Sequence, residues 1–448
     1  MKQSKFIPYI FAIACTAVYI SLVFNNNVWL DEAFSASIIR CDFVEMAART
    51  FADTLPPFYN FSAWLFTHIF GFSTVSLKIF SVMPMTLLML ISAHFIPKFS
   101  SVRAACIYIA LLTAMPHFLE YGVEIRMYSQ AICFASATAI FALCLLHDIP
   151  HSALWLIITT VLGAYTHQYA LIAEAFVWLM LLFVYIRNKS FSGWLRYAVI
   201  CIVCYIPCAV LTIYQMKSAV PYFSASPATL SNMMSSMRYP FVTHITILSA
   251  LLMAFALILL LYACTKGKLA YAYYILVYVL VTMLSFGLMS ATGSTFFSSR
   301  YLLPAIGILW LGTALSLDSM LSENKYVWFV AVPLITVSLI VLYVQQFKAE
   351  YVDTSAFEEF ISSTDDKDGY VIYEDFPEIE ICLGYYAPWL KKYDLKDIKK
   401  AEGNKYVFVN GDVHTDDIAE IKDLKFDLGY VENLNFDRYT FGVYILSP

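Results

Sequence analysis

The chain has 448 residues, of which 60% are hydrophobic and only 14% are charged. Soluble globular chains are nearer half apolar and a quarter charged, and the mean hydropathy of this chain is +0.68. The composition therefore excludes a single soluble domain and predicts an integral membrane protein with many spans.

The net charge of −5 is unevenly distributed along the chain. Residues 1–345 contain 17 Lys and Arg against 11 Asp and Glu, whereas residues 346–448 contain 11 against 22. We expect a transmembrane catalytic domain over 1–345 and a small, soluble α/β domain over 346–448. Within the second part, strand-like runs lie at 370–373, 405–409 and 436–446, and a helix-like run lies at 416–424. The chain has no basic surface of the kind that nucleic acid would require, so nucleic acid is not an expected partner.

Eleven apolar stretches have a length and composition typical of membrane helices, which need roughly 20 residues at about 1.5 Å each. The expected fold class is mainly α, a polytopic membrane protein with about 11 transmembrane helices. The stretches lie at residues 6–24, 75–96, 104–118, 125–146, 153–165, 168–186, 197–214, 242–264, 269–289, 302–317 and 326–344.

The positions of Lys and Arg predict the orientation of these spans. Alternating the spans from a cytoplasmic N-terminus places ten Lys and Arg in inner segments and seven in outer segments. Cytoplasmic loops are enriched in these residues. We therefore expect a multi-pass protein of the cell (cytoplasmic) membrane with a cytoplasmic N-terminus and an extracytoplasmic C-terminal domain.

Two outer loops are long. The loop over 25–74 alternates acidic and apolar residues at helical spacing, which predicts two interfacial amphipathic helices separated by Pro56 and Pro57. The loop over 215–241 is rich in Pro and Ser, carries Lys217 and Arg238, and is interpreted as a flap over the outer face.

An acidic pair, Asp31-Glu32, directly follows the first span, at the depth where water meets lipid headgroups. A carboxylate there could act as a general base. Alternatively, either residue could simply cap the helix that follows.

The predicted topology brings further polar residues to the same outer face as Asp31. Arginine binds phosphate oxygens with a planar fork, carboxylates handle protons, and Tyr and His can line a sugar site, so this combination suits a lipid-phosphate substrate. The residues are Asp53, Tyr59, Glu124, Arg126, Tyr128, His167, Arg300 and Tyr301.

Five motifs in this order resemble the polytopic GT-C glycosyltransferases, in the branch with protein O-mannosyltransferases and the bacterial lipid A aminoarabinose transferase. Over roughly residues 1–310 the resemblance rests on the acidic pair, the Asp53–Tyr59 stretch with its two prolines, Glu-x-Arg-Met-Tyr at 124–128, the Tyr-Thr-His turn at 165–169 and Arg-Tyr-Leu-Leu-Pro at 300–304. Leu55 stands where relatives place a polar histidine, and Gln168 interrupts the aromatic turn.

The resemblance implies an inverting transfer of a sugar, hexose or pentose, from a polyprenyl-phosphate donor on the outer leaflet to a lipid, protein or glycan acceptor. Asp31 matches the base that takes the acceptor proton, while Glu32 and Asp53 position Asp31 or substrate hydroxyls. The candidates to stabilise the departing phosphate are Arg126, Lys217, Arg238 and Arg300.

Three alternatives stay open. In one of them the chain is a membrane-anchored binding protein whose C-terminal part, residues 346–448, recognises an extracellular partner. A transporter or flippase of a lipid or glycan would use charges near the membrane midplane, where the sequence places Glu174. A divalent metal ion could neutralise the donor phosphate through Asp31, Glu32 and Asp42, although the outer cations could do the same, and we expect no required metal.

Overall fold

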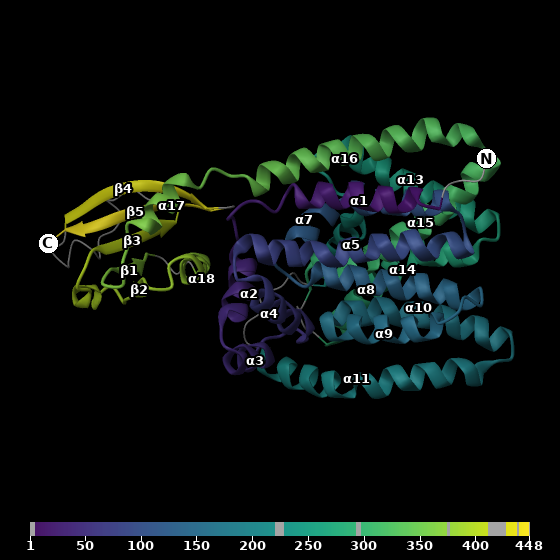
Figure 1. The fold of residues 1–448 in the computed structure, drawn as a ribbon, viewed down its shortest axis with the longest axis horizontal. Coiled ribbons are helices and arrows are strands. Elements are labelled where there is room, and N and C mark those ends of the chain that lie inside the picture. Colours follow the sequence, from purple (N-terminus) through teal and green to yellow (C-terminus); the bar gives the residue numbers. More distant parts are fainter. Residues whose placement is uncertain are drawn as a thin grey trace.

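The computed structural model describes residues 5–219, 228–292, 297–373, 377–410, 427–436 and 439–447. A bundle of long helices makes up most of the molecule, and a smaller domain built on a sheet lies beyond one end of it (Figure 1). The helix expected at 416–424 lies outside the described residues.

Each predicted apolar stretch corresponds to one helix of the bundle. Eight of these helices are long and apolar enough to cross a membrane, and α1, α6 and α9 are shorter apolar helices. The prediction of a multi-pass membrane protein is confirmed. The helices are α1 (Ile7–Ile20), α5 (Thr74–Phe99), α6 (Val102–Ala114), α8 (Tyr128–Leu146), α9 (Ser152–Thr166), α10 (Gln168–Arg187), α11 (Phe191–Ala219), α13 (Thr246–Thr265), α14 (Leu269–Thr292), α15 (Leu303–Glu323) and α16 (Trp328–Glu350).

Local sequence explains where several helices begin and end. Ser73 and Ser101 each accept a backbone N–H of the first turn of α5 and of α6. Helix α6 ends at Ala114, earlier than hydropathy predicts, because Met115 precedes Pro116 and is extended. Helix α16 continues through the expected domain boundary at 345/346.

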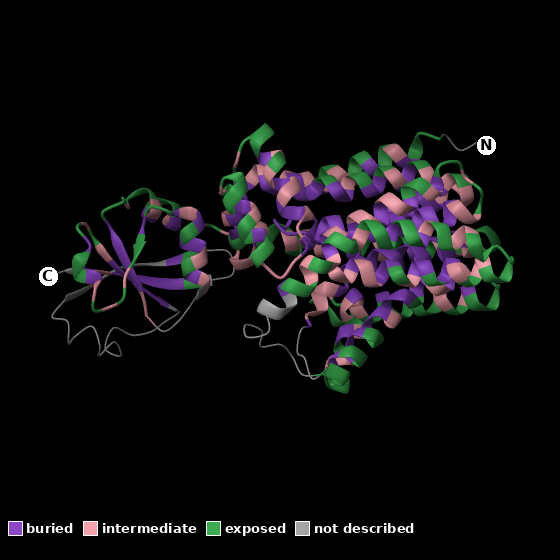
Figure 2. Ribbon diagram, turned by 90° about the horizontal axis from the view of Figure 1, so that it is seen from below, coloured by how far each residue is buried: buried purple, intermediate pink, exposed green. Residues whose placement is uncertain are grey.

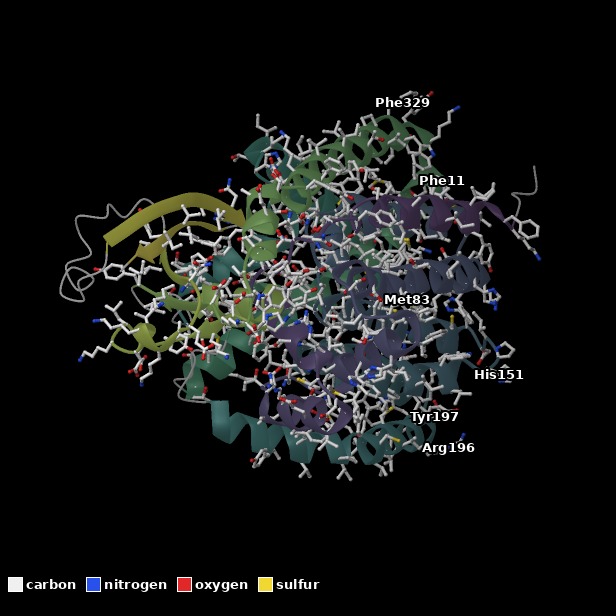
Figure 3. All side chains as sticks on the ribbon, turned by 60° about the vertical axis from the view of Figure 1, so that its left-hand side comes forward. Phe11, Met83, His151, Arg196, Tyr197 and Phe329 are labelled. Atoms are coloured by element: carbon white, nitrogen blue, oxygen red, sulfur yellow. The ribbon has the colours of Figure 1, made fainter. Side chains whose placement is uncertain are left out.

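The bundle is apolar both inside and on its outer surface. Trp310 and Tyr108 are fully buried, whereas Phe11, Met83 and Phe329, labelled in Figure 3, are exposed. Buried residues line the interior of the bundle and exposed ones its periphery (Figure 2). A lipid environment accounts for exposed apolar side chains in such numbers.

The first long loop forms three helices, where the sequence predicted two: α2 (Leu30–Arg40), α3 (Phe43–Ala52) and α4 (Phe58–Phe70). The prolines separate α3 from α4 as expected. The additional break falls at Cys41 because the Asp42 side chain accepts the N–H groups of Val44 and Glu45 and starts a new helix.

Shorter helices and turns lie in the other connections between the long helices. The connection between α6 and α8 contains α7 (Phe118–Val123). The second long loop, expected to be a flap, contains α12 (Leu230–Arg238) and the 3-10 turn η2 (Tyr239–Phe241), and a further turn, η3 (Ser299–Leu302), precedes α15.

The C-terminal part contains a five-stranded sheet in the order β2-β1-β3-β5-β4. Strands β2, β1 and β3 are parallel, whereas β5 is antiparallel to both β3 and β4. The three strand-like runs of the sequence lie in β1, β3 and β4–β5. The elements are α17 (Ser355–Ser362), β1 (Gly369–Ile372), α18 (Pro377–Tyr386), β2 (Lys391–Lys392), β3 (Lys405–Asn410), β4 (Asp427–Phe436) and β5 (Tyr439–Ser447).

The chain ends lie far apart. The N-terminus is at one end of the bundle, and the sheet domain is beyond the opposite end, where α2, α3 and α4 gather (Figure 1). This arrangement places the loop that carries Asp31 between the spanning helices and the C-terminal domain.

Candidate active site

Asp31 and Arg300, far apart in the sequence, form an ion pair at the end of the bundle that faces the C-terminal domain. Arg300 Nη1 lies 2.6 Å from Asp31 Oδ2, and the two side chains are 26% and 20% exposed. The guanidinium also lies over the Trp29 ring, 5.5 Å from its centroid. The Nε atom of Arg300 has no hydrogen-bond partner among the described residues, so the cation retains a donor for a further anion.

Arg126 also contacts the first turns of α2. Its Nη1 donates to Ser35 Oγ at 2.9 Å and to the backbone oxygen of Asp31 at 3.4 Å. The side chain is 9% exposed. Because Ser35 is one helical turn after Asp31, one face of α2 presents both the carboxylate and the group that orients Arg126.

The two residues of the acidic pair have different surroundings. Glu32 is buried and accepts the N–H of Trp29 at 3.1 Å and that of Ile125 at 2.8 Å. Glu32 therefore caps α2 and ties it to the connection between α7 and α8. The capping role that the sequence left open for either residue falls to Glu32, and Asp31 faces Arg300.

Three further predicted residues lie around this pair. Burial raises the pKa of Asp53, and the nearby Arg126 opposes that rise. Burial, together with Glu32 and Glu120, raises the pKa of Glu124 well above its usual range. Tyr59 is buried in α4 with its ring near Phe80.

His167 joins α9 to α10 inside an aromatic cluster. Its ring lies 5.9 Å from that of Tyr128 and 5.5 Å from that of Tyr301. Its Nδ1 accepts the N–H of Tyr169 at 3.0 Å, and burial, with Arg126 and Arg300, lowers its pKa to about 3. The imidazole is therefore neutral with its proton on Nε2, which has no partner in the described part of the chain.

A polar pocket of about 350 Å³ opens beside Arg300. Its walls carry hydroxyl, amide and aromatic groups together with one guanidinium, a combination that suits a ligand with both hydroxyl groups and negative charge. The lining residues are Tyr121, Asn232, Ser235, Ser236, Tyr239, Phe286, Phe297, Ser298, Ser299 and Arg300.

The structure does not bring every predicted cation to this pocket. Arg238 ends α12 with an exposed side chain and is not among the pocket-lining residues. The side chain of Lys217 lies outside the described residues.

The acidic residues considered for a metal do not converge. Asp42 is exposed and caps α3. Within the described ranges, no group of three or more His, Cys, Asp or Glu could hold a metal ion.

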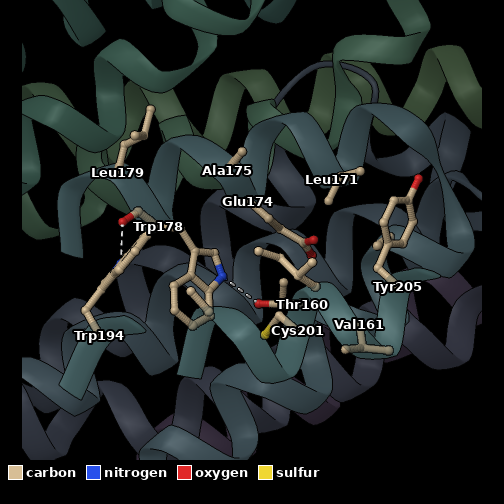
Figure 4. A pocket seen from close by; sticks show the side chains of 13 residues that line it. Thr160, Val161, Leu171, Glu174, Ala175, Trp178, Leu179, Trp194, Cys201 and Tyr205 are labelled. Atoms are coloured by element: carbon tan, nitrogen blue, oxygen red, sulfur yellow. Dashed lines mark hydrogen bonds between the residues drawn. The ribbon is translucent and has the colours of Figure 1, made fainter. Parts of the chain in front are cut away.

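Glu174, which the sequence placed near the membrane midplane, lies in a different setting. Its Oε1 accepts from Thr138 Oγ1 at 3.4 Å, and a Cβ on Gly163 would lie 2.0 Å from the same oxygen, so a larger residue there would require the Glu174 carboxyl group to move. The carboxyl group faces an apolar groove of about 340 Å³ between α9, α10 and α11, with Thr160 and Trp178 nearby (Figure 4).

Sequence reasoning missed several groups at the site. Ser35 could have been found, since it is four residues after Asp31 on the same helix. Trp29, which lies beneath Arg300, directly precedes α2. Ser236 and Ser299 meet at 3.1 Å although they are 63 residues apart, and no local pattern indicates such a contact.

Comparisons with known proteins show what the fold of the chain resembles. No protein-family model matches the chain, and no curated protein matches it. Solved structures do match, and they confirm the fold that the motifs implied, that of the GT-C glycosyltransferases.

Three of the matching structures are informative. ArnT from Cupriavidus metallidurans in the apo state is 11% identical, with a TM-score of 0.66 over 98% of this chain and 97% of that chain. The same protein bound to undecaprenyl phosphate is 12% identical, with a TM-score of 0.64 over the same shares. The Archaeoglobus fulgidus oligosaccharyltransferase tethered to an acceptor peptide is 12% identical, with a TM-score of 0.53 over 99% of this chain and 74% of that chain.

Proposed function

We propose that the protein is an inverting glycosyltransferase that moves a sugar, a hexose or a pentose, from a polyprenyl-phosphate donor to an acceptor at the outer face of the cell membrane. The observation that carries this proposal is the Asp31–Arg300 ion pair at the edge of the polar pocket. It joins a base for the acceptor proton to a cation for the leaving phosphate. The shared fold with ArnT, which has been seen with undecaprenyl phosphate, supports the donor class.

The chemistry is a single displacement. A hydroxyl group of a lipid, protein or glycan acceptor gives its proton to the Asp31 carboxylate, and its oxygen attacks the anomeric carbon. The bond between that carbon and the phosphate oxygen breaks, and polyprenyl phosphate leaves with the electron pair. Attack opposite the leaving group inverts the anomeric configuration.

Arg300 has two partners in this scheme. Its Nη1 lies 2.6 Å from Asp31 Oδ2 and forms an ion pair with it. A bound phosphate competes for the guanidinium, so that Arg300 shifts toward the phosphate and Asp31 is free to accept a proton. Arg126, held by Ser35, adds a second positive charge in a poorly hydrated site, where charge stabilisation is large.

The remaining residues have supporting roles. Glu32 positions Asp31 by holding the start of α2. Neutral His167 donates from Nε2 to a substrate oxygen, and Asp53, Tyr59, Glu124, Tyr128 and Tyr301 line the donor. Lys217 and Arg238 remain proposed phosphate contacts.

The topology belongs to the proposal as well. The N-terminus lies in the cytoplasm, and the division at 345/346 separates the catalytic membrane domain from an extracytoplasmic domain. This orientation places the ion pair at the outer leaflet.

Comparison of glycans from strains with and without the gene tests the proposal. A strain that lacks the gene should lose one sugar from a surface lipid, protein or polymer, detected by mass spectrometry. The wild-type gene should restore it, and the Asp31→Asn variant, present in the membrane at the same level, should not. Restoration by Asp31→Asn would contradict the proposal, and substrate flux across proteoliposomes without a glycosidic product would favour a transporter instead.

A further inference from the structure

The loop that leads from α1 into α2 is held by contacts from outside the spanning bundle. It contains three consecutive asparagines, Asn25 to Asn27, followed by Val28 and Trp29. Asp31 lies in the first turn after this loop. Its position therefore depends on how the loop backbone is fixed.

One anchor comes from the end of α16. Lys78 Nζ, which is buried, lies 2.5 Å from Glu350 Oε2 and 2.7 Å from Asn25 Oδ1. Asn27 Nδ2 donates to the backbone oxygen of Glu350 at 2.8 Å. These contacts fix the middle of the loop to the last spanning helix.

The second anchor comes from the C-terminal domain. The hydroxyl group of Tyr386, the last residue of α18, donates to the backbone oxygen of Asn26 and accepts the N–H of Val28 at 3.0 Å. A phenolic hydroxyl has one proton to donate, and here it bridges two backbone groups of the loop. Val28 directly precedes Trp29. The backbone N–H of Trp29 donates to Glu32, and the Arg300 guanidinium lies over the Trp29 ring.

The neighbouring tyrosine makes a different contact. Tyr385 shares a hydrogen bond of 2.8 Å with Thr74 at the start of α5. The Arg40 guanidinium lies 5.0 Å from the centroid of the Tyr385 ring. Tyr385 therefore docks α18 on the bundle through Thr74 and Arg40, and it provides a matched control.

We infer that Tyr386 is a positioning residue, through which the C-terminal domain sets the backbone before Asp31 and hence the placement of its carboxylate. This inference rests on the proposed function. It makes the C-terminal domain a part of the catalytic unit, with its effect exerted on the rate of transfer and not on donor binding.

Hydrogen exchange and transfer, measured on the full chain, test this inference together. In nanodiscs, Tyr386→Phe should raise amide exchange at least tenfold in peptides that cover 24–32, because the Val28 N–H loses its acceptor. The same variant should lower the rate at which the missing sugar is restored in cells by about three- to tenfold. Its affinity for undecaprenyl phosphate should stay within about twofold, since no phosphate contact is removed. Tyr385→Phe should leave both the exchange of 24–32 and the transfer rate unchanged.

The outcomes separate the two claims. Unchanged exchange in Tyr386→Phe, or raised exchange with unchanged transfer, would overturn the positioning role even when Asp31→Asn is inactive. An active Asp31→Asn would overturn the proposed function instead. Should Tyr386→Phe melt well below the wild type, exchange and transfer are measured at a temperature at which the variant is folded. Unchanged values at that temperature would overturn the positioning role of Tyr386.

Discussion

Two regions of the membrane domain each contain a buried or half-buried carboxylate, and their neighbours differ. At the end that faces the C-terminal domain, Asp31 is 20% exposed and forms an ion pair with Arg300. Arg126 donates to the backbone oxygen of Asp31. Midway along α10, Glu174 is fully buried, accepts a bond from Thr138 and faces an apolar groove. A carboxylate can serve as a base when nearby cations keep it ionised and substrate can reach it. Asp31 lies beside two arginines and is partly exposed, whereas Glu174 lies beside a neutral hydroxyl group in an apolar wall.

The largest effect expected after loss of the base itself is that of Arg300→Ala. Removal of the cation that stabilises the leaving phosphate should lower transfer by roughly 10²- to 10³-fold. Arg300→Lys should recover part of the loss, since a lysine keeps the charge but not the planar fork. Initial rates of sugar transfer in membranes with matched protein levels provide the measurement, and a loss below fivefold would remove Arg300 from the site.

Glu32→Ala should act on structure and activity together. The variant leaves the N–H groups of Trp29 and Ile125 without their carboxylate partner, which is expected to destabilise the fold by about 2–4 kcal/mol. Thermal unfolding in detergent, followed by intrinsic fluorescence, provides the test. Gln keeps one acceptor oxygen, for one of the two N–H groups, and turns an NH2 donor toward the other. Glu32→Gln should therefore lose less stability than Glu32→Ala, and equal losses would mean that neither hydrogen bond survives without the carboxylate.

Glu124 and His167 should give the fold opposite responses to pH. The pKa of Glu124 is raised, so its contribution to stability is present at low pH and is lost as the pH rises above its unfolded value of 4.5. The pKa of His167 is lowered to about 3, so its contribution is present at neutral pH and is lost as the pH falls from 6.5 toward 3.

Melting temperatures of Glu124→Gln and His167→Gln between pH 4 and pH 8 separate these two contributions. Relative to the wild type, Glu124→Gln should gain stability at pH 8, and His167→Gln should lose less stability than the wild type on acidification. Parallel curves for all three proteins would show that neither group is buried as described.

The smallest effect is expected from Glu174→Gln. The amide retains an oxygen that can accept from Thr138, and no substrate atom is placed near it, so transfer should stay within about twofold of the wild type. Gly163→Ala is the sensitive comparison, because its Cβ would collide with the carboxyl oxygen of Glu174. A tenfold loss of sugar transfer in Glu174→Gln would show that a residue in the membrane interior has a functional role.

Hydropathy and charge predicted the features of the fold that a lipid environment imposes. Each of the eleven apolar stretches became a helix, since length and composition alone decide whether a segment can span a membrane. The ends of these helices depended on single residues that hydropathy averages out, such as Pro116 after α6. The third helix of the first loop depended on one capping side chain, Asp42.

The site was only partly predictable for a similar reason. The five motifs shared with the GT-C glycosyltransferases predicted Asp31, Arg126, Arg300 and His167 as site residues. The structure brings these four residues to one end of the bundle. Which residue of Asp31-Glu32 caps the helix depends on the backbone N–H of Ile125, which donates to Glu32 and lies 93 residues after it in the sequence. The contact of Tyr386 with the loop depends on how a separate domain docks, and no local pattern encodes it.

The most direct test of the central claim combines binding and turnover in one variant. Asp31→Asn in nanodiscs should bind undecaprenyl phosphate at least as tightly as the wild type, because Arg300 loses its competing carboxylate, while sugar transfer falls by about 10²- to 10⁴-fold. Transfer at the wild-type rate would contradict the account, and so would a loss of binding that equals the loss of transfer.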